Sequence, residues 1–164
     1  EVLVKGKNLF QGYWDGFQIN PPSSWFATKD LGEICLDKHL HITGRKDRLF
    51  ISGGENIQPE EIEQALCSIS GIICATVLPK LDKEFGSRPV AFIEDTKQRP
   101  LAQIFFELQK ILPSFKCPIG IWPYPKHLKN TSVKTPIPLL EQHIKNLFSK
   151  DVLQDTLLVS KEEV

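Results

Sequence analysis

The chain has 164 residues, of which 41% are hydrophobic, and this length and composition suit one globular unit of ordinary size with a packed core. Twenty Lys and Arg residues balance twenty Asp and Glu residues, so the sequence lacks the positive excess of a nucleic-acid-binding domain. No apolar run approaches the roughly 18 residues of a membrane-spanning helix, and no signal-peptide pattern opens the chain, so we expect a cytoplasmic protein without a membrane span.

The first 43 residues predict short β-strands. Asn20-Pro21-Pro22-Ser23-Ser24 interrupts them, and the stretches Glu33 to Asp37 and His39 to Thr43 predict a hairpin with a tight Asp-Lys turn. This region looks like a β remnant of a larger domain.

A charged turn, a strand, a diglycine loop and a helix start follow one another in residues 44–63. Leu49 to Ser52 predicts a short strand, and Gly53-Gly54 supplies backbone that can take positive φ and approach a ligand closely. On these residues alone, the glycines could serve only to turn the chain. Pro59 suits the start of a helix over 59–69. Its buried face is predicted from the spacing i, i+3, i+4, i+7 of Ile62, Ala65, Leu66 and Ile69.

The rest of the chain predicts an α+β unit. The expected elements are strands over 72–78 and 89–94, helices over 101–112 and 138–148, and a Pro-rich connector over 113–136. Helical periodicity marks two core faces, formed by Leu101, Ile104, Phe105, Leu108 and Leu112 and by Leu140, Ile144, Leu147 and Phe148.

The cysteines and histidines lack the spacing of a metal site. Cys35, Cys67, Cys74 and Cys117 form no Cys-x-x-Cys pair, which argues against a zinc site or a redox dithiol. Free cysteine usually packs as a small apolar side chain. We therefore expect no resident metal site and assign these residues no chemistry.

Three motifs in order resemble the acyl-adenylate-forming ligases, the family of acyl-CoA synthetases, peptide-synthetase adenylation domains and luciferases. They are Glu1 to Gly6 with Gly12-Tyr13-Trp14, then Trp25 to Ile34, then Gly44 to Ile57 followed by the Pro59-Glu60-Glu61-Ile62-Glu63 helix start. The segments 82–91 and 128–134 are most similar to the menaquinone-pathway branch of this family. The resemblance covers residues 1–148.

This resemblance implies a fold and a domain division. Residues 1–43 would be the β-rich end of the large N-terminal AMP-binding domain, residues 44–148 the mobile C-terminal lid domain, and residues 149–164 a tail. The lid domain is α+β, with a short hairpin, then a small mixed sheet with flanking helices. Nothing in the chain resembles the phosphate loop of the family, so we expect a fragment that is inactive alone.

The resemblance places Asp30 and Arg45 at the ribose of ATP, where a carboxylate can accept two hydrogen bonds from the vicinal hydroxyls. The alternative for Asp30 is a turn acceptor. The family usually has Gly at the position of Lys29, and this change is expected to stiffen the loop. Asp47 falls at the hinge between an adenylate-forming and a thioester-forming pose, or is simply a hydrated charge. The CoA tunnel would be lined by Ser52, Gly53, Gly54 and Glu55.

Lys134 is the catalytic residue that the resemblance implies, bridging the substrate carboxylate and the α-phosphate. Lys126 and Lys129 are nearby alternatives, and any of these lysines could simply be solvated. Val133 stands where most members have Gly, and the usual Arg after the lysine is missing.

The implied activity is ATP-dependent ligation of a carboxylic acid to CoA. Its cofactors would be ATP, CoA and Mg²⁺ with the ATP, and its partners the small-molecule acid and the missing N-terminal domain. Another acid, a stand-alone module that binds CoA or nucleotide without catalysis, and a plain interaction domain remain the alternatives.

Overall fold

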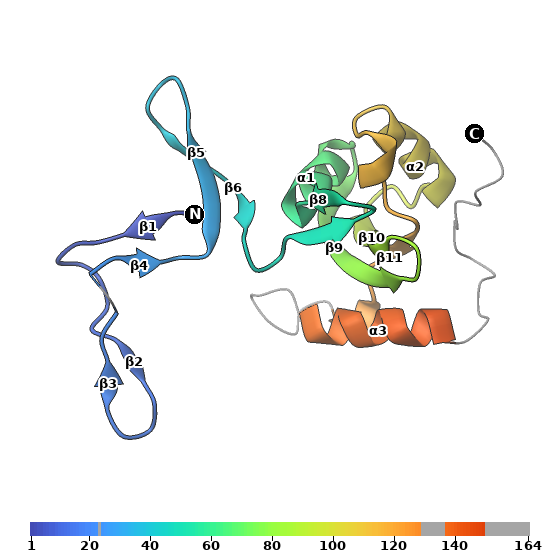
Figure 1. The fold of residues 1–164 in the computed structure, drawn as a ribbon. Helices are drawn as coiled ribbons and strands as arrows, with labels where there is room; N and C mark the ends of the chain where they lie inside the picture. The colour runs from blue at the N-terminus through green and yellow to red at the C-terminus, as the bar shows by residue number, and fades with distance from the viewer. Residues whose placement is uncertain (23, 129–136, 150–164) are drawn as a thin grey trace. The chain divides into compact units, whose positions relative to one another are not determined.

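The computed structural model describes residues 1–22, 24–128 and 137–149 (Figure 1). Its contacts divide the chain into two units, Glu1–Arg48 and a second that begins at Leu49. Gly44 and Arg45 complete the strand β6 (Leu40–Arg45) of the first unit. None of the helices in the described ranges has the length and apolar character needed to cross a membrane.

The first unit consists of three antiparallel two-stranded ribbons. β1 (Leu3–Val4) pairs with β4 (Phe26–Ala27), β2 (Tyr13–Trp14) with β3 (Ile19–Asn20), and β5 (Asp30–Ile34) with β6 (Leu40–Arg45). The predicted hairpin is therefore present, with its strands shifted to either side of a longer turn. The Cys35 amide donates to the His39 carbonyl at 2.9 Å, and Lys38 takes a φ of 66° in this turn.

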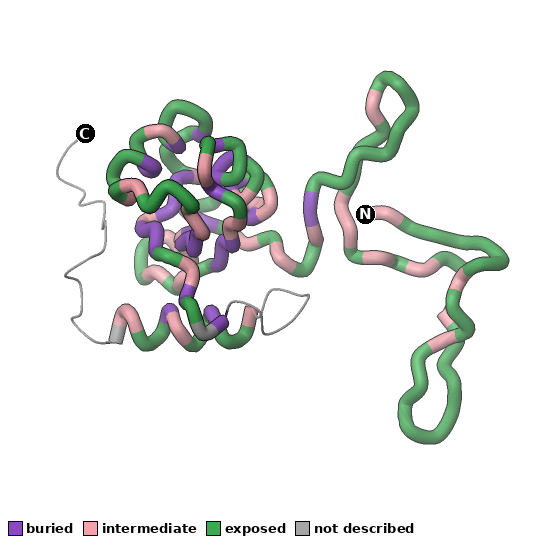
Figure 2. Tube along the Cα trace, turned by 180° about the vertical axis from the view of Figure 1, so that it is seen from behind, coloured by how far each residue is buried: buried purple, intermediate pink, exposed green. Residues whose placement is uncertain are grey.

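These ribbons bury little of their own apolar surface, as Figure 2 shows for residues 1–48. Gly44 is the one buried residue among those described in this unit. Large side chains such as Trp14, Phe17 and Trp25 are more than half exposed. A two-stranded ribbon is only marginally stable without packing on one face. Within the described residues, the first unit therefore leaves most of its large apolar side chains exposed.

The second unit is built on a five-stranded sheet. Its strands are β7 (Phe50–Ser52), β8 (Glu55–Ile57), β9 (Ile72–Asp82), β10 (Gly86–Asp95) and β11 (Ile121–Pro123). β10 pairs antiparallel with β9 and, at its first residue, with β7, whereas β11 runs parallel to it. The helices are α1 (Pro59–Ser68), α2 (Leu101–Gln109) and α3 (Ile137–Ser149), and 3-10 turns span Ser114–Lys116 and Lys126–Leu128.

Alternating side chains of β9 and β10 supply two hydrophobic cores, one on each face of the sheet (Figure 1). On one face, Val77, Ala91 and Ile93 pack with residues of α1 and α2. On the other face, Leu78, Val90 and Phe92 pack with Leu140 and Ile144 of α3. The predicted α+β fold is confirmed. The predicted apolar faces of the three helices pack on the two cores, although Leu101, Leu147 and Phe148 are only partly buried.

Three local predictions differ from the structure. β11 lies inside the expected connector, because a strand of three residues that follows Gly120 and ends on Pro123 is too short to show a strand pattern. No strand was predicted between Ser52 and the helix that starts at Pro59, but β8 pairs with β7 across the diglycine turn. α2 ends at Gln109, although Leu112 beyond it is still buried in the core.

Candidate functional site

One arginine connects two of the predicted site residues in the first unit. Asp30 and Arg45 face each other across β5 and β6, and Arg45 Nη1 donates to Asp30 Oδ1 at 3.2 Å. Arg45 also donates two hydrogen bonds to Asp47, from Nε to Oδ1 at 2.9 Å and from Nη2 to Oδ2 at 2.9 Å. The hydrogen bonds from Arg45 hold the pKa of Asp47 below its ordinary value of 3.8. Asp30 thus directs its carboxylate to Arg45, a side chain 15 positions away.

Lys29 stands next to this cluster in a backbone conformation that favours glycine. Its φ is 65°, in the left-handed region. Its carbonyl accepts a hydrogen bond from the Lys46 amide at 2.7 Å, and its Nζ lies 4.0 Å from Asp47 Oδ2. The Lys that replaces the usual Gly of the family therefore keeps the glycine-like backbone and adds a cation beside Asp47.

The diglycine loop is the turn between β7 and β8. Gly53 and Gly54 have φ values of 58° and 90°, as a two-residue type I′ hairpin turn requires. A Cβ on Gly53 would lie 2.8 Å from Phe85 Cδ1, whereas a Cβ on Gly54 would meet no atom within 4 Å. Gly53 is therefore packed against protein, and Gly54 presents bare backbone to open space. Ser52 and Glu55, which flank the turn, pair with each other.

The turn between β9 and β10 supports the diglycine loop, and no role was expected for it. Asp82 Oδ1 accepts hydrogen bonds from the amides of Glu84 and Phe85, both at 2.9 Å, and these bonds lower the pKa of Asp82. The Phe85 carbonyl accepts from the Gly53 amide at 3.0 Å. The Arg88 guanidinium lies 5.0 Å from the centre of the Phe85 ring. The turn could be foreseen from Asp82 and Gly86, but its contact with Gly53 could not.

The predicted site residues thus fall into two described groups. Asp30, Arg45 and Asp47 belong to the first unit, and Ser52 to Glu55 belong to the second. Lys134, the expected catalytic residue, and Lys129 lie outside the described residues. Lys126 opens the 3-10 turn before them. Within the described part of the chain, no three His, Cys, Asp or Glu side chains come together as a metal site would need.

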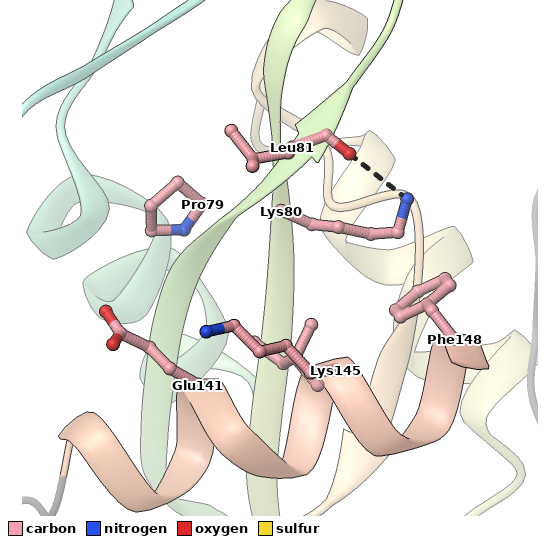
Figure 3. Close-up of a pocket in the computed structure, with 7 residues that line it drawn as sticks. Pro79, Lys80, Leu81, Glu141, Lys145 and Phe148 are labelled. Carbon is pink, nitrogen blue, oxygen red and sulfur yellow. Dashed lines mark hydrogen bonds between the residues drawn. The ribbon is translucent and has the colours of Figure 1, made fainter. Parts of the chain in front are cut away.

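A groove of about 260 Å³ lies between β9 and α3 and contains none of the predicted site residues (Figure 3). Pro79, Lys80 and Leu81 line it from the strand, and Glu141, Ile144, Lys145 and Phe148 line it from the helix. Lys80 Nζ lies 4.4 Å from the centre of the Phe148 ring and donates to the Leu81 carbonyl at 3.3 Å. The stem of Lys80 therefore covers apolar surface while its charge stays at the edge.

Comparison with known proteins gives relatives in sequence, although no family model matches the chain. A 2-succinylbenzoate–CoA ligase of Haemophilus influenzae is 44% identical over 135 residues, which are 79% of this chain and 30% of that protein. An indoleacetate–CoA ligase of Aromatoleum aromaticum is 36% identical over 62% of this chain and 20% of that protein. The chain spans about a third of the length of such curated relatives.

Solved structures share its fold. Wild-type E. coli MenE, bound to an m-phenylether-linked analogue of OSB-AMS, is 31% identical with a TM-score of 0.73, over 88% of this chain and 32% of that one. ATP-bound MatB from Rhodopseudomonas palustris is 29% identical with a TM-score of 0.71, over 88% and 30%. Sequence and fold therefore agree on the same class of proteins.

Proposed function

The chain belongs to the acyl-adenylate-forming superfamily and corresponds to the C-terminal part of its members, and we propose that it works as part of a 2-succinylbenzoate–CoA ligase in menaquinone biosynthesis. The observation that carries this proposal is the 44% identity with the Haemophilus ligase over 79% of the chain. In the proposed reaction, the acid carboxylate attacks the α-phosphorus of ATP and pyrophosphate leaves. The CoA thiol then attacks the acyl carbon of the acyl-adenylate, and AMP leaves.

Asp30 and Arg45 are proposed to hold the ribose of ATP. An ionised carboxylate can accept hydrogen bonds from both ribose hydroxyls, and the guanidinium supplies directed donors beside it. Their ion pair at 3.2 Å supports this role, because it keeps the two groups together before nucleotide arrives. Asp30 and Arg45 side chains are 37% and 42% exposed, so both are accessible to a ligand.

The other predicted site residues are proposed to act in adenylation, in domain rotation and in CoA binding. Lys134 is proposed to bridge the acid carboxylate and the α-phosphate during adenylation, since a point cation stabilises the charge that develops there. Asp47 is proposed as the hinge at which residues 44–148 turn as a mobile domain, with 149–164 as a tail. Gly53 and Gly54 would border the CoA thiol arm, together with Ser52 and Glu55. The open space beside Gly54 supports this assignment.

The cofactors and partners follow from the same proposal. ATP and CoA are the cosubstrates, and Mg²⁺ enters bound to ATP as part of that substrate. The acid pocket and the phosphate loop are assigned to an N-terminal domain, whose end would be residues 1–43. The exposed apolar ribbons of the first unit are consistent with such a neighbour. We expect the reaction in the cytoplasm, where ATP and CoA are supplied.

A chimera tests the proposal. The Haemophilus ligase would receive this chain in place of its own aligned segment, and the product would be assayed for pyrophosphate release and for acyl-CoA formation from o-succinylbenzoate. We expect both half-reactions to be retained, and a matched chimera with Lys134→Ala to lose adenylation. A folded chimera without either half-reaction would contradict the proposal. The isolated chain should release no pyrophosphate under the same conditions.

A ligase for another acid is the second candidate, and the indoleacetate–CoA ligase among the relatives favours it. The acid pocket is assigned to the N-terminal domain, so the chimera does not distinguish the two. The longer protein that contains this chain should therefore be assayed with o-succinylbenzoate and with indoleacetate. A higher kcat/KM for o-succinylbenzoate is the expected result, and the reverse order would favour the second candidate.

A further inference from the structure

We propose that the carboxylate of Asp47 is a positioning residue for Arg45, so that the same residue that serves as the hinge also sets the orientation of the arginine at the nucleotide. This inference rests on the proposed function. It gives the side chain of Asp47 a role in addition to the backbone rotation that is expected at this residue.

The geometry of the pair carries the argument. Both oxygens of Asp47 are engaged, at 2.9 Å from Arg45 Nε and 2.9 Å from Nη2. A fork-to-fork pair of this kind fixes the plane of the guanidinium as well as its position. One edge of Arg45 is held by Asp47, which leaves Nη1 directed at Asp30 at 3.2 Å. The orientation of the ribose pair therefore depends on a third side chain.

The backbone explains why this contact would change during hinge motion. Arg45 ends β6 and is held in register opposite Asp30. Asp47 lies two residues further on, in a turn closed by the Arg48 amide donating to the Arg45 carbonyl at 3.2 Å. A change of φ or ψ at a hinge swings the groups beyond it while those before it stay in place. Rotation about φ of Asp47 turns its side chain together with the residues beyond it, so such a rotation would withdraw the Asp47 carboxylate from Arg45 and leave Arg45 on the strand.

Lys29 takes part in the same arrangement. Its Nζ lies 4.0 Å from Asp47 Oδ2, on the oxygen that Arg45 Nη2 also contacts. The four charges of Lys29, Asp30, Arg45 and Asp47 balance, so the cluster carries no net charge in this pose. Loss of the Asp47 carboxylate would leave two cations beside Asp30 and would remove the two contacts that fix the plane of the guanidinium.

Kinetics of the adenylation step in the chimera would test the inference. Asp47→Asn keeps the size of the side chain but removes its charge and one of the two acceptors. We expect it to raise the KM for ATP about 10-fold in adenylation, the size of a lost charge-assisted hydrogen bond, with a smaller effect on transfer from preformed acyl-adenylate. Asp47→Glu should recover part of the loss. An equal fall of both half-reactions with unchanged KM would show a hinge role alone and overturn the inference.

A second measurement is independent of activity. In the chain labelled with ¹⁵N-arginine, the Nε proton of Arg45 should exchange slowly with solvent, and Asp47→Asn should accelerate this exchange several-fold. Asp37→Asn is the matched control, because Asp37 also contacts a residue two positions on, His39 at 2.9 Å, at the tip of the β5–β6 turn. If the chimera does not adenylate, the proposed function fails. The exchange measurement would still show whether Asp47 orients Arg45. Unchanged exchange in Asp47→Asn would overturn the inference.

Discussion

The amide of Gly53 donates to the carbonyl of Phe85 at 3.0 Å, and the Phe85 ring occupies the space where a side chain on Gly53 would be, with Cδ1 2.8 Å from an ideal Cβ. The two residues belong to different hairpins of the second unit. Their contact fixes the diglycine turn against the β9–β10 turn, so the proposed CoA loop has a rigid support on one side and open space on the other.

Gly53→Ala should lower the free energy of unfolding of the second unit by about 1–3 kcal/mol, because it combines a left-handed φ with a clash against Phe85. Denaturant unfolding followed by tryptophan fluorescence measures this loss. Gly54→Ala is the control, since its φ is 90° but its Cβ would meet nothing within 4 Å. Phe85→Ala should relieve part of the Gly53→Ala loss in the double variant. Equal losses in the two glycine variants would argue against the clash.

Lys29→Gly should stabilise the backbone around the β5–β6 ribbon by up to about 1 kcal/mol, because it removes the strain of a left-handed Lys at the cost of one exposed ion pair. Hydrogen exchange of the Lys46 amide, which bonds to the Lys29 carbonyl, reports this local stability. Lys38→Gly is the control, with a φ of 66° and a place in the turn between the same strands. A faster exchange of the Lys46 amide in Lys29→Gly would mean that the contact with Asp47 outweighs the strain.

Asp15 should remain ionised to unusually low pH. Hydrogen bonds from the Gln18 amide, the Asn20 side chain and the Phe17 amide lower its pKa to about 2. Because the folded pKa lies below the ordinary value of 3.8, the contribution of Asp15 to stability is present above that value and is lost as pH falls towards about 2. A carboxyl NMR titration measures the pKa, and Asn20→Ala should raise it. A midpoint near 3.8 in the parent chain would contradict the hydrogen bonds.

Lys134→Ala in the chimera should reduce adenylation about 10²–10³-fold, the usual cost of removing one group that stabilises developing charge, and should affect acyl transfer from preformed acyl-adenylate far less. Pyrophosphate release and acyl-CoA formation measure the two half-reactions separately. Lys126→Ala and Lys129→Ala are the matched controls, because these lysines were the alternatives to Lys134. Equal losses in both half-reactions would remove Lys134 from its assigned role.

The sequence by itself determined the family and the order of most elements. Its motifs occur in a fixed order, and apolar spacing identified the buried faces of α1, α2 and α3 because helical periodicity is a local property of the chain. It also marked Lys29 as a departure from the family, and the structure gives that position a left-handed backbone. The role of Lys134 and the exact domain division stay predictions.

Tertiary structure alone decided which side chains meet. The Asp30–Arg45 contact depends on the register of β5 against β6, the Gly53–Phe85 contact on two hairpins coming together, and β11 on a parallel partner 30 positions earlier, as in the pair Ala91 and Ile121. Register and pairing are set by residues far apart in the chain, and no local pattern encodes them. The two hydrogen bonds from Arg45 to Asp47 also could not be predicted from the sequence, although the residues are only two positions apart. These neighbouring charges become a positioned pair only when the turn between them is folded.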